Sequence, residues 1–187
     1  NVLFNLKTII SSGKVRQIGI SNENPWAFMK YLELSKKKLP KTITIQNPYS
    51  LLNRLFEIGN SEICMREDVG LLAYSPLGFG VLSGKYLNGN MPKDSRLKLF
   101  PNLSRFSGEN SMKATSMYYN ISKKYNLSLT QMALSFVNSR PFVTSNIIGA
   151  TKLSQLKENI ESINIDLSED ALKEINEVHK LIPNPAP

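Results

Sequence analysis

Short polar or small residues follow four apolar runs in this sequence, and their types suit a planar ligand that carries phosphate. The runs and their endings are VRQIGI before Ser21-Asn22, TITI before Gln46-Asn47, LLA before Tyr74-Ser75, and NII before Gly149-Ala150-Thr151. The amide of an asparagine or glutamine both donates and accepts hydrogen bonds, so it can hold a carboxamide. The aromatic ring of a tyrosine can stack on a planar ring.

Each of these residues also has a purely structural interpretation. Asn22 could be a turn residue, Gln46 a buried amide whose hydrogen bonds are made within the protein, and Tyr74 part of the core. The segment Ser75-Pro76-Leu77-Gly78 could offer backbone N–H groups to a phosphate, or it could be an ordinary turn. None of these local signals decides between the two interpretations.

A long irregular segment and one helix extend the candidate site. Residues 76–110 carry five glycines and three prolines, which is typical of a functional lid or a disordered loop. Lys85 and Arg96 are the cations in this segment best placed to reach a phosphate, although most loop cations are only solvated. Thr151 is predicted as the N-cap of the following helix, whose N-terminus favours anions. Three polar residues follow at spacings that bring them near one another: Gln155, Glu158 and Asn159.

The apolar runs predict β-strands over 15–20, 42–46, 71–75 and 146–150, separated by helices. Helices are expected over 3–12, from Pro25, around 57–66, over 111–124 and 129–139, after Thr151, and over 168–182. Local signals support three starts: Asn24 before Pro25, a capping box from Ser128 to Gln131, and Ser168 as N-cap. Alternating strands and helices imply parallel pairing, with ligands at the carboxyl ends of the strands. A closed barrel of this kind needs eight strands, and the sequence predicts only half of them.

Composition restricts the possible functions. The chain has 187 residues, 41% of them hydrophobic, which suits one domain but is short of the roughly 250 residues of a full (β/α)8 barrel. The single cysteine, Cys64, fits a reducing, cytoplasmic compartment. The net charge of +8 is spread through helices together with acids, so we expect no nucleic-acid partner. No membrane-spanning or secretory segment is expected, and the first residues suggest a fragment. The only histidine, His179, lies where a helix C-terminus favours it, and we expect no metal site or catalytic role for it.

Four blocks, in this order and spacing, resemble the aldo-keto reductases, most closely the Tas-like branch: GKVRQIGISN, TIQNPYSLLNR, LLAYSPLGFGVLSGKY and IIGATKLSQLKENI. The resemblance runs through essentially the whole chain. It implies an α/β fold that is the C-terminal half of a (β/α)8 TIM barrel, with four parallel strands and surrounding helices. Residues 1–187 would then be a single partial domain with strands 5 to 8 of the barrel.

The resemblance also implies an NADP(H) site. Ser21, Asn22 and Gln46 would hold the nicotinamide carboxamide, and Tyr74 would stack on the nicotinamide ring. The turn Ser75, Pro76, Leu77 and Gly78, with Lys85, would lie along the pyrophosphate. The remaining expected positions are Arg96, Thr151 and Gln155 toward the 2′-phosphate, and Glu158 and Asn159 at the adenine.

The resemblance implies a full-length enzyme that reduces a small aldehyde or ketone by hydride transfer. The family's catalytic Asp, Tyr, Lys and His belong to the first four strands, and no segment of this chain matches them. We therefore assign no catalytic residue and expect the chain alone to be inactive. Two alternatives stay open. One is a nucleotide-responsive binding module, as in the potassium-channel β subunits that the chain also resembles through the SGKY and GAT…QL.EN blocks. The other is an inert truncated product. The exposed edges of a half-barrel also predict self-association.

Overall fold

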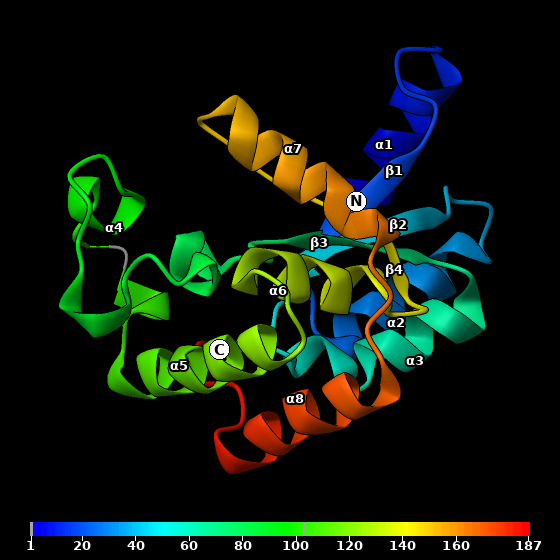
Figure 1. Cartoon of the computed structure of the whole chain (residues 1–187). Coiled ribbons are helices and arrows are strands. Elements are labelled where there is room, and N and C mark those ends of the chain that lie inside the picture. Colours follow the sequence, from blue (N-terminus) through cyan, green and yellow to red (C-terminus); the bar gives the residue numbers. More distant parts are fainter. Residues whose placement is uncertain (1, 103) are drawn as a thin grey trace.

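A four-stranded parallel sheet organises the chain in the computed structural model, which describes residues 2–102 and 104–187 (Figure 1). The strands are β1 (Ile18–Ser21), β2 (Thr42–Pro48), β3 (Gly70–Tyr74) and β4 (Val143–Asn146), and they lie side by side in chain order. Every neighbouring pair is parallel, as the alternation of strands and helices predicts. β1 and β4 are therefore the two edges of this sheet.

The helices follow the strands in the expected alternation. They are α1 (Val2–Ser11), α2 (Pro25–Ser35), α3 (Asn60–Glu67), α4 (Arg96–Leu99), α5 (Glu109–Lys124), α6 (Leu129–Asn138), α7 (Leu153–Glu161) and α8 (Glu169–Leu181). The segment 76–110 is largely turns, apart from α4 and short 3₁₀ turns. Tyr86, Leu97 and Phe106 of this segment are buried in the core, so it is packed against the domain and is not a free lid.

Local capping explains where several helices begin. The Asn24 side chain accepts a hydrogen bond from the Ala27 N–H at 3.0 Å, directly before Pro25. The Ser128 hydroxyl accepts from the Gln131 N–H at 3.0 Å, while the Gln131 side chain accepts from the Ser128 N–H at 2.9 Å. The predicted N-cap and capping box are confirmed, because these contacts span only three residues and depend little on the rest of the fold.

The predicted position of the fourth strand along the sequence is wrong. The sequence favours 146–150, whereas β4 runs from Val143 to Asn146 and pairs with Leu71–Ala73 of β3. Pairing continues only as far as the Ile147 N–H, which donates to the Ala73 carbonyl at 2.8 Å. The short strand β3 has only a few backbone N–H and carbonyl groups that can pair on this side. Residues 143–146, which precede most of the predicted apolar run, form these hydrogen bonds in its place.

The two faces of the sheet differ in what covers them. Ile45, Leu71 and Ala73 are fully buried in the core, whereas the alternating residues Thr44 and Leu72 are only half-buried. Figure 1 shows α2, α3, α5 and α8 below the sheet, while α1 and α7 project above it. Successive side chains of a strand point to opposite faces, so one face forms the core and the other stays open.

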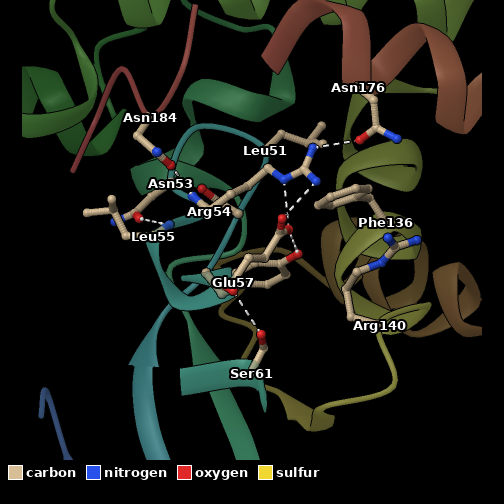
Figure 2. Close-up of polar contacts among 12 residues, drawn as sticks. Leu51, Asn53, Arg54, Leu55, Glu57, Ser61, Phe136, Arg140, Asn176 and Asn184 are labelled. Atoms are coloured by element: carbon tan, nitrogen blue, oxygen red, sulfur yellow. Dashed lines mark hydrogen bonds and ion pairs between the residues drawn. The ribbon is translucent and has the colours of Figure 1, made fainter. Parts of the chain in front are cut away.

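A buried polar network joins the connection after β2 to the C-terminal helix (Figure 2). The Arg54 guanidinium donates to both Glu57 carboxylate oxygens, at 2.7 and 2.9 Å, and to the Asn176 side chain of α8 at 2.8 Å. The Tyr49 hydroxyl donates to the same carboxylate. Phe136 stacks between the guanidinium groups of Arg54 and Arg140. These contacts link residues more than a hundred positions apart and fix α8 against the core.

Candidate functional site

Three of the four predicted strand ends meet where β1, β2 and β3 end, at the carboxyl end of the sheet. The Ser21 hydroxyl donates to the Gln46 carbonyl at 2.9 Å, and the Asn22 side-chain amide donates to the Ser21 hydroxyl at 2.8 Å. The Tyr74 hydroxyl, from the end of β3, donates to the Asn22 side-chain oxygen at 2.7 Å. Ser21 and Asn22 are exposed and Gln46 and Tyr74 are half-buried, so all four are at least partly accessible to solvent.

Asn22 has a left-handed backbone, with φ of 58°, which turns its side chain across the strand ends. Its N–H donates to the Gln46 carbonyl at 3.0 Å and to the Asn47 side-chain oxygen at 2.9 Å. Asn47 follows the second apolar run together with Gln46 but is not among the predicted site residues. The only sequence feature that points to Asn47 is its position next to Gln46. Its contact with Asn22 arises from the pairing of β1 with β2.

The turn after β3 has an unusual backbone. Ser75, Gly78, Phe79 and Gly80 all have positive φ, between 52° and 89°. Both its positive φ and its close surroundings favour glycine at position 78. A Cβ there would lie only 3.0 Å from the Phe106 ring. The Gly78 N–H donates to the Ser75 carbonyl at 2.9 Å, so this N–H is used within the turn. Phosphate binding by the turn, through the segment Ser75–Gly78, stays a prediction.

The two predicted loop cations gather at this same turn. The Arg96 guanidinium lies over the Phe79 ring, 4.6 Å from its centroid. The Lys85 ammonium lies against Gly80, where an added Cβ would be 2.8 Å from Nζ. In the described part of the chain neither cation forms an ion pair. Two uncompensated positive charges beside a turn that follows the Tyr74 strand end are suited to an anionic ligand.

The N-terminus of α7 is capped differently from the prediction. The N-cap is Lys152, and the Gln155 side-chain oxygen accepts from the N–H groups of Thr151 at 3.0 Å and Lys152 at 3.2 Å. The Thr151 hydroxyl also donates to this oxygen, at 3.2 Å. The assignment of Thr151 as N-cap is therefore wrong, because Gln155 reaches back from the first turn and takes the donors itself. An anion here would have to replace the Gln155 oxygen.

Glu158 and Asn159 make contacts within the protein. The Ser128 hydroxyl, at the start of α6, donates to the Glu158 carboxylate at 2.5 Å. Asn159 is buried, and its side chain donates to the Gly149 carbonyl at 3.4 Å. Glu158 thus links α7 to the start of α6, and Asn159 holds the loop before α7 in place. Their predicted contact with adenine is not tested by these interactions.

Other reactive groups do not form a second site. Cys64 is buried, and burial raises the pKa of its thiol to about 12, so it is a small core residue and not a nucleophile. Burial, followed by the charge of Arg54, lowers the pKa of His179. No group of three potential metal ligands occurs among residues 2–102 and 104–187. Within the same residues, no helix has the length and apolarity needed to cross a membrane.

A model of the aldo/keto reductase family matches residues 1–180. The chain is 52% identical to the protein tas of Escherichia coli (strain K12) over 177 residues, covering 94% of this chain and 51% of that protein. It is 38% identical to an aldo-keto reductase of Babesia bovis over 183 residues, covering 93% and 64%. It is 35% identical to the L-glyceraldehyde 3-phosphate reductase of Escherichia coli (strain K12) over 162 residues, covering 83% and 46%.

This chain spans about half the length of the tas proteins that it matches. The family match and the four parallel strands agree with a partial (β/α) barrel that carries polar residues at the carboxyl ends of its strands. The chain belongs to the aldo/keto reductase family.

Proposed function

We propose that this chain is the cofactor-binding part of an NADP(H)-dependent oxidoreductase that reduces an aldehyde or ketone. The observation that carries this proposal is the cluster of Ser21, Asn22, Gln46 and Tyr74 at the carboxyl ends of the strands. It lies beside a turn with two cations that form no ion pair among the described residues. The cluster supplies amide and hydroxyl groups for a carboxamide and an aromatic ring for stacking. The cations supply positive charge for phosphates.

The residues present fit a dinucleotide of this kind. Asn22 and Gln46 would hold the carboxamide, and Tyr74 would stack on the nicotinamide ring, since its ring lies at the strand end beside Asn22. Lys85 and Arg96 would meet the phosphates, with the segment Ser75–Gly78 along the pyrophosphate. Asn47 would keep Asn22 in its left-handed conformation. The bound cofactor would supply the hydride.

The 2′-phosphate is the feature that should separate NADPH from NADH. Arg96 is exposed and forms no ion pair with any residue that the structure describes, so its full charge is available for this group. A hydrogen bond between charged groups contributes about 1.5–3 kcal/mol, which corresponds to roughly a 10- to 150-fold change in affinity. The charge that Arg96 provides would then favour NADPH.

The isolated chain should bind cofactor without turning over substrate. Its sequence has no segment that matches the catalytic Asp, Tyr, Lys and His of the family, and loss of a general acid alone costs about 10²- to 10⁴-fold in rate. We expect no steady oxidation of NADPH when the chain is mixed with a reactive aldehyde. Steady turnover would contradict the assignment of catalysis to the remainder of the whole protein.

Titration of NADPH and NADH against the intrinsic fluorescence of the chain tests the proposal directly. Arg96→Ala should weaken NADPH about tenfold or more and change NADH little. Lys98→Ala is the matched control, because Lys98 is an exposed cation on the same short helix, α4. Equal loss for the two nucleotides, or an equal effect of Lys98→Ala, would refute the role of Arg96. A chain that binds neither nucleotide would refute the cofactor assignment itself.

A further inference from the structure

Phe79 lies in the turn beside the candidate site, at a position where any side chain is costly. Its φ is 55° and its ψ is 26°, and its neighbours Gly78 and Gly80 also have positive φ. Glycine adopts this left-handed conformation readily, whereas a Cβ comes too close to the following carbonyl oxygen. Among residues 2–102 and 104–187, Phe79 is the one aromatic residue with positive φ. Backbone strain of this kind concentrates at functional sites, so the contacts of the Phe79 ring indicate its role.

Two contacts of this ring connect Arg96 to the core. The Arg96 guanidinium lies over the Phe79 ring, 4.6 Å from its centroid. The Phe79 ring also meets the Phe106 ring edge to face, with the centroids 4.8 Å apart and an angle of 76° between the planes. Phe106 is buried in the core, and the absence of a side chain at Gly78 gives its ring room. Phe79 therefore joins an exposed cation to a fixed part of the domain.

The backbone of Arg96 is held firmly, whereas its side chain extends into solvent. The next residue, Leu97, is buried, and its N–H donates to the Tyr86 hydroxyl at 3.3 Å. The Arg96 side chain is exposed and forms no ion pair with a residue that the structure describes. A ligand that orders a free arginine side chain loses affinity through the lost rotamer entropy. Contact with the Phe79 ring lowers this cost, because the guanidinium is already held before the ligand binds.

A guanidinium held on a ring keeps its hydrogen-bonding capacity. Its five N–H donors lie in the plane of the group, and cation–π contact uses the charge of the group without consuming a donor. The outer edge of the Arg96 guanidinium can therefore still form two parallel hydrogen bonds to one phosphate. A cation with a fixed position and a free planar edge favours a ligand that carries a phosphate over the same ligand without it.

We propose that Phe79 is a positioning residue that holds Arg96 toward the 2′-phosphate and thereby sets the preference for NADPH over NADH. This role rests on the proposed function, because it concerns the phosphate that Arg96 would meet there. Phe79 acts through Arg96 and requires no contact of its own with the nucleotide. Loss of the ring should therefore weaken the binding of NADPH and leave that of NADH nearly unchanged.

Fluorescence titration of NADPH and NADH against variants of this chain tests the role of Phe79. Phe79→Leu keeps an apolar side chain against Phe106 but removes the ring, and it should weaken NADPH about three- to tenfold. Its affinity for NADH should change less than about twofold, which also shows that the site still folds. Phe79→Tyr keeps the ring and should bind NADPH within about twofold of wild type. Phe100→Leu is the matched control, because Phe100 belongs to the same segment and is 57% exposed.

A double-mutant cycle separates positioning of Arg96 from general support of the turn. In the Arg96→Ala background, Phe79→Leu should change NADPH affinity less than about twofold, because the group that the ring positions is absent. A residue that only supports the turn would weaken NADPH by the same factor in both backgrounds. The cycle therefore reads the coupling between Phe79 and Arg96 directly.

Several outcomes would overturn the role of Phe79. Equal loss of NADPH and NADH in Phe79→Leu would show that the ring only supports the turn, as would independent effects of Phe79→Leu and Arg96→Ala. A loss in Phe79→Tyr or Phe100→Leu as large as that in Phe79→Leu would refute the need for this ring. If Arg96→Ala abolishes the preference for NADPH and Phe79→Leu does not, the role of Phe79 is refuted while the proposed function stands. A wild-type chain that binds neither nucleotide would refute both.

Discussion

Replacing Arg54 with methionine should remove a large polar contribution to the stability of this domain. The Arg54 side chain is only 9% exposed, and it donates two hydrogen bonds to Glu57 and one to Asn176. Methionine keeps much of the aliphatic volume but leaves the Glu57 carboxylate without its counter-ion. Breaking a buried pair costs about 3–5 kcal/mol. Because Glu57 is 29% exposed and solvent screens it in part, we expect a loss of about 2–4 kcal/mol.

Urea unfolding, followed by tryptophan fluorescence at one fixed protein concentration, measures this loss. In a domain of this size it corresponds to a fall in melting temperature of about 5–15 °C. Arg66→Met is the matched control, because Arg66 also bonds a glutamate, Glu62, at 2.7 Å, but both side chains are mostly exposed. That variant should lose no more than about 0.5 kcal/mol. A loss below about 1 kcal/mol for Arg54→Met, or equal losses for both variants, would refute the reasoning.

The same pair predicts a pH dependence. Burial alone would raise the pKa of Glu57, but hydrogen bonds from Arg54 and Tyr49 outweigh it and hold this pKa below its usual value. The folded state therefore binds fewer protons at this group than the unfolded state near the unfolded pKa of about 4.3. The stabilisation is fully present above that pH and is lost as the pH falls through the lower, folded pKa. The difference between wild type and Arg54→Met should thus be greatest above about pH 5 and shrink toward pH 3.

Three further predictions concern other parts of the chain. Cys64 should react slowly with a thiol reagent at pH 8 until the protein unfolds, because it is buried and its pKa is raised to about 12; rapid reaction in the native state would contradict its burial. Ser128→Ala should cost about 1 kcal/mol in urea unfolding, because α6 loses its N-cap, and an unchanged midpoint would contradict this. Asn47→Ala should weaken NADPH binding, whereas Asn47→Asp should restore much of it, since the oxygen that accepts from the Asn22 N–H is kept. Equal loss in both variants would show that this oxygen does not position Asn22.

Much of the fold can be predicted from the sequence because the signals involved are local. The starts of α2, α6 and α8 follow from Asn24, Ser128 and Ser168, each of which caps an N–H three residues away. The strand segments follow from apolar runs between turn residues, and their alternation with helices is enough to predict parallel pairing. Part of the candidate site is predictable for the same reason, since parallel strands bring their carboxyl ends to one edge.

The sequence by itself therefore determined the order of strands and helices, the caps, and the polar character of the strand ends. Only the tertiary structure decided which of these residues meet. The register of β4 depends on the backbone groups that β3 offers, and the contact between Asn47 and Asn22 depends on the pairing of β1 with β2. The cap of α7 by Gln155 and the network around Arg54 likewise arise from competition among partners in space. A local pattern shows which hydrogen bonds and contacts a residue is able to make. The packing of distant segments determines which partner it actually contacts.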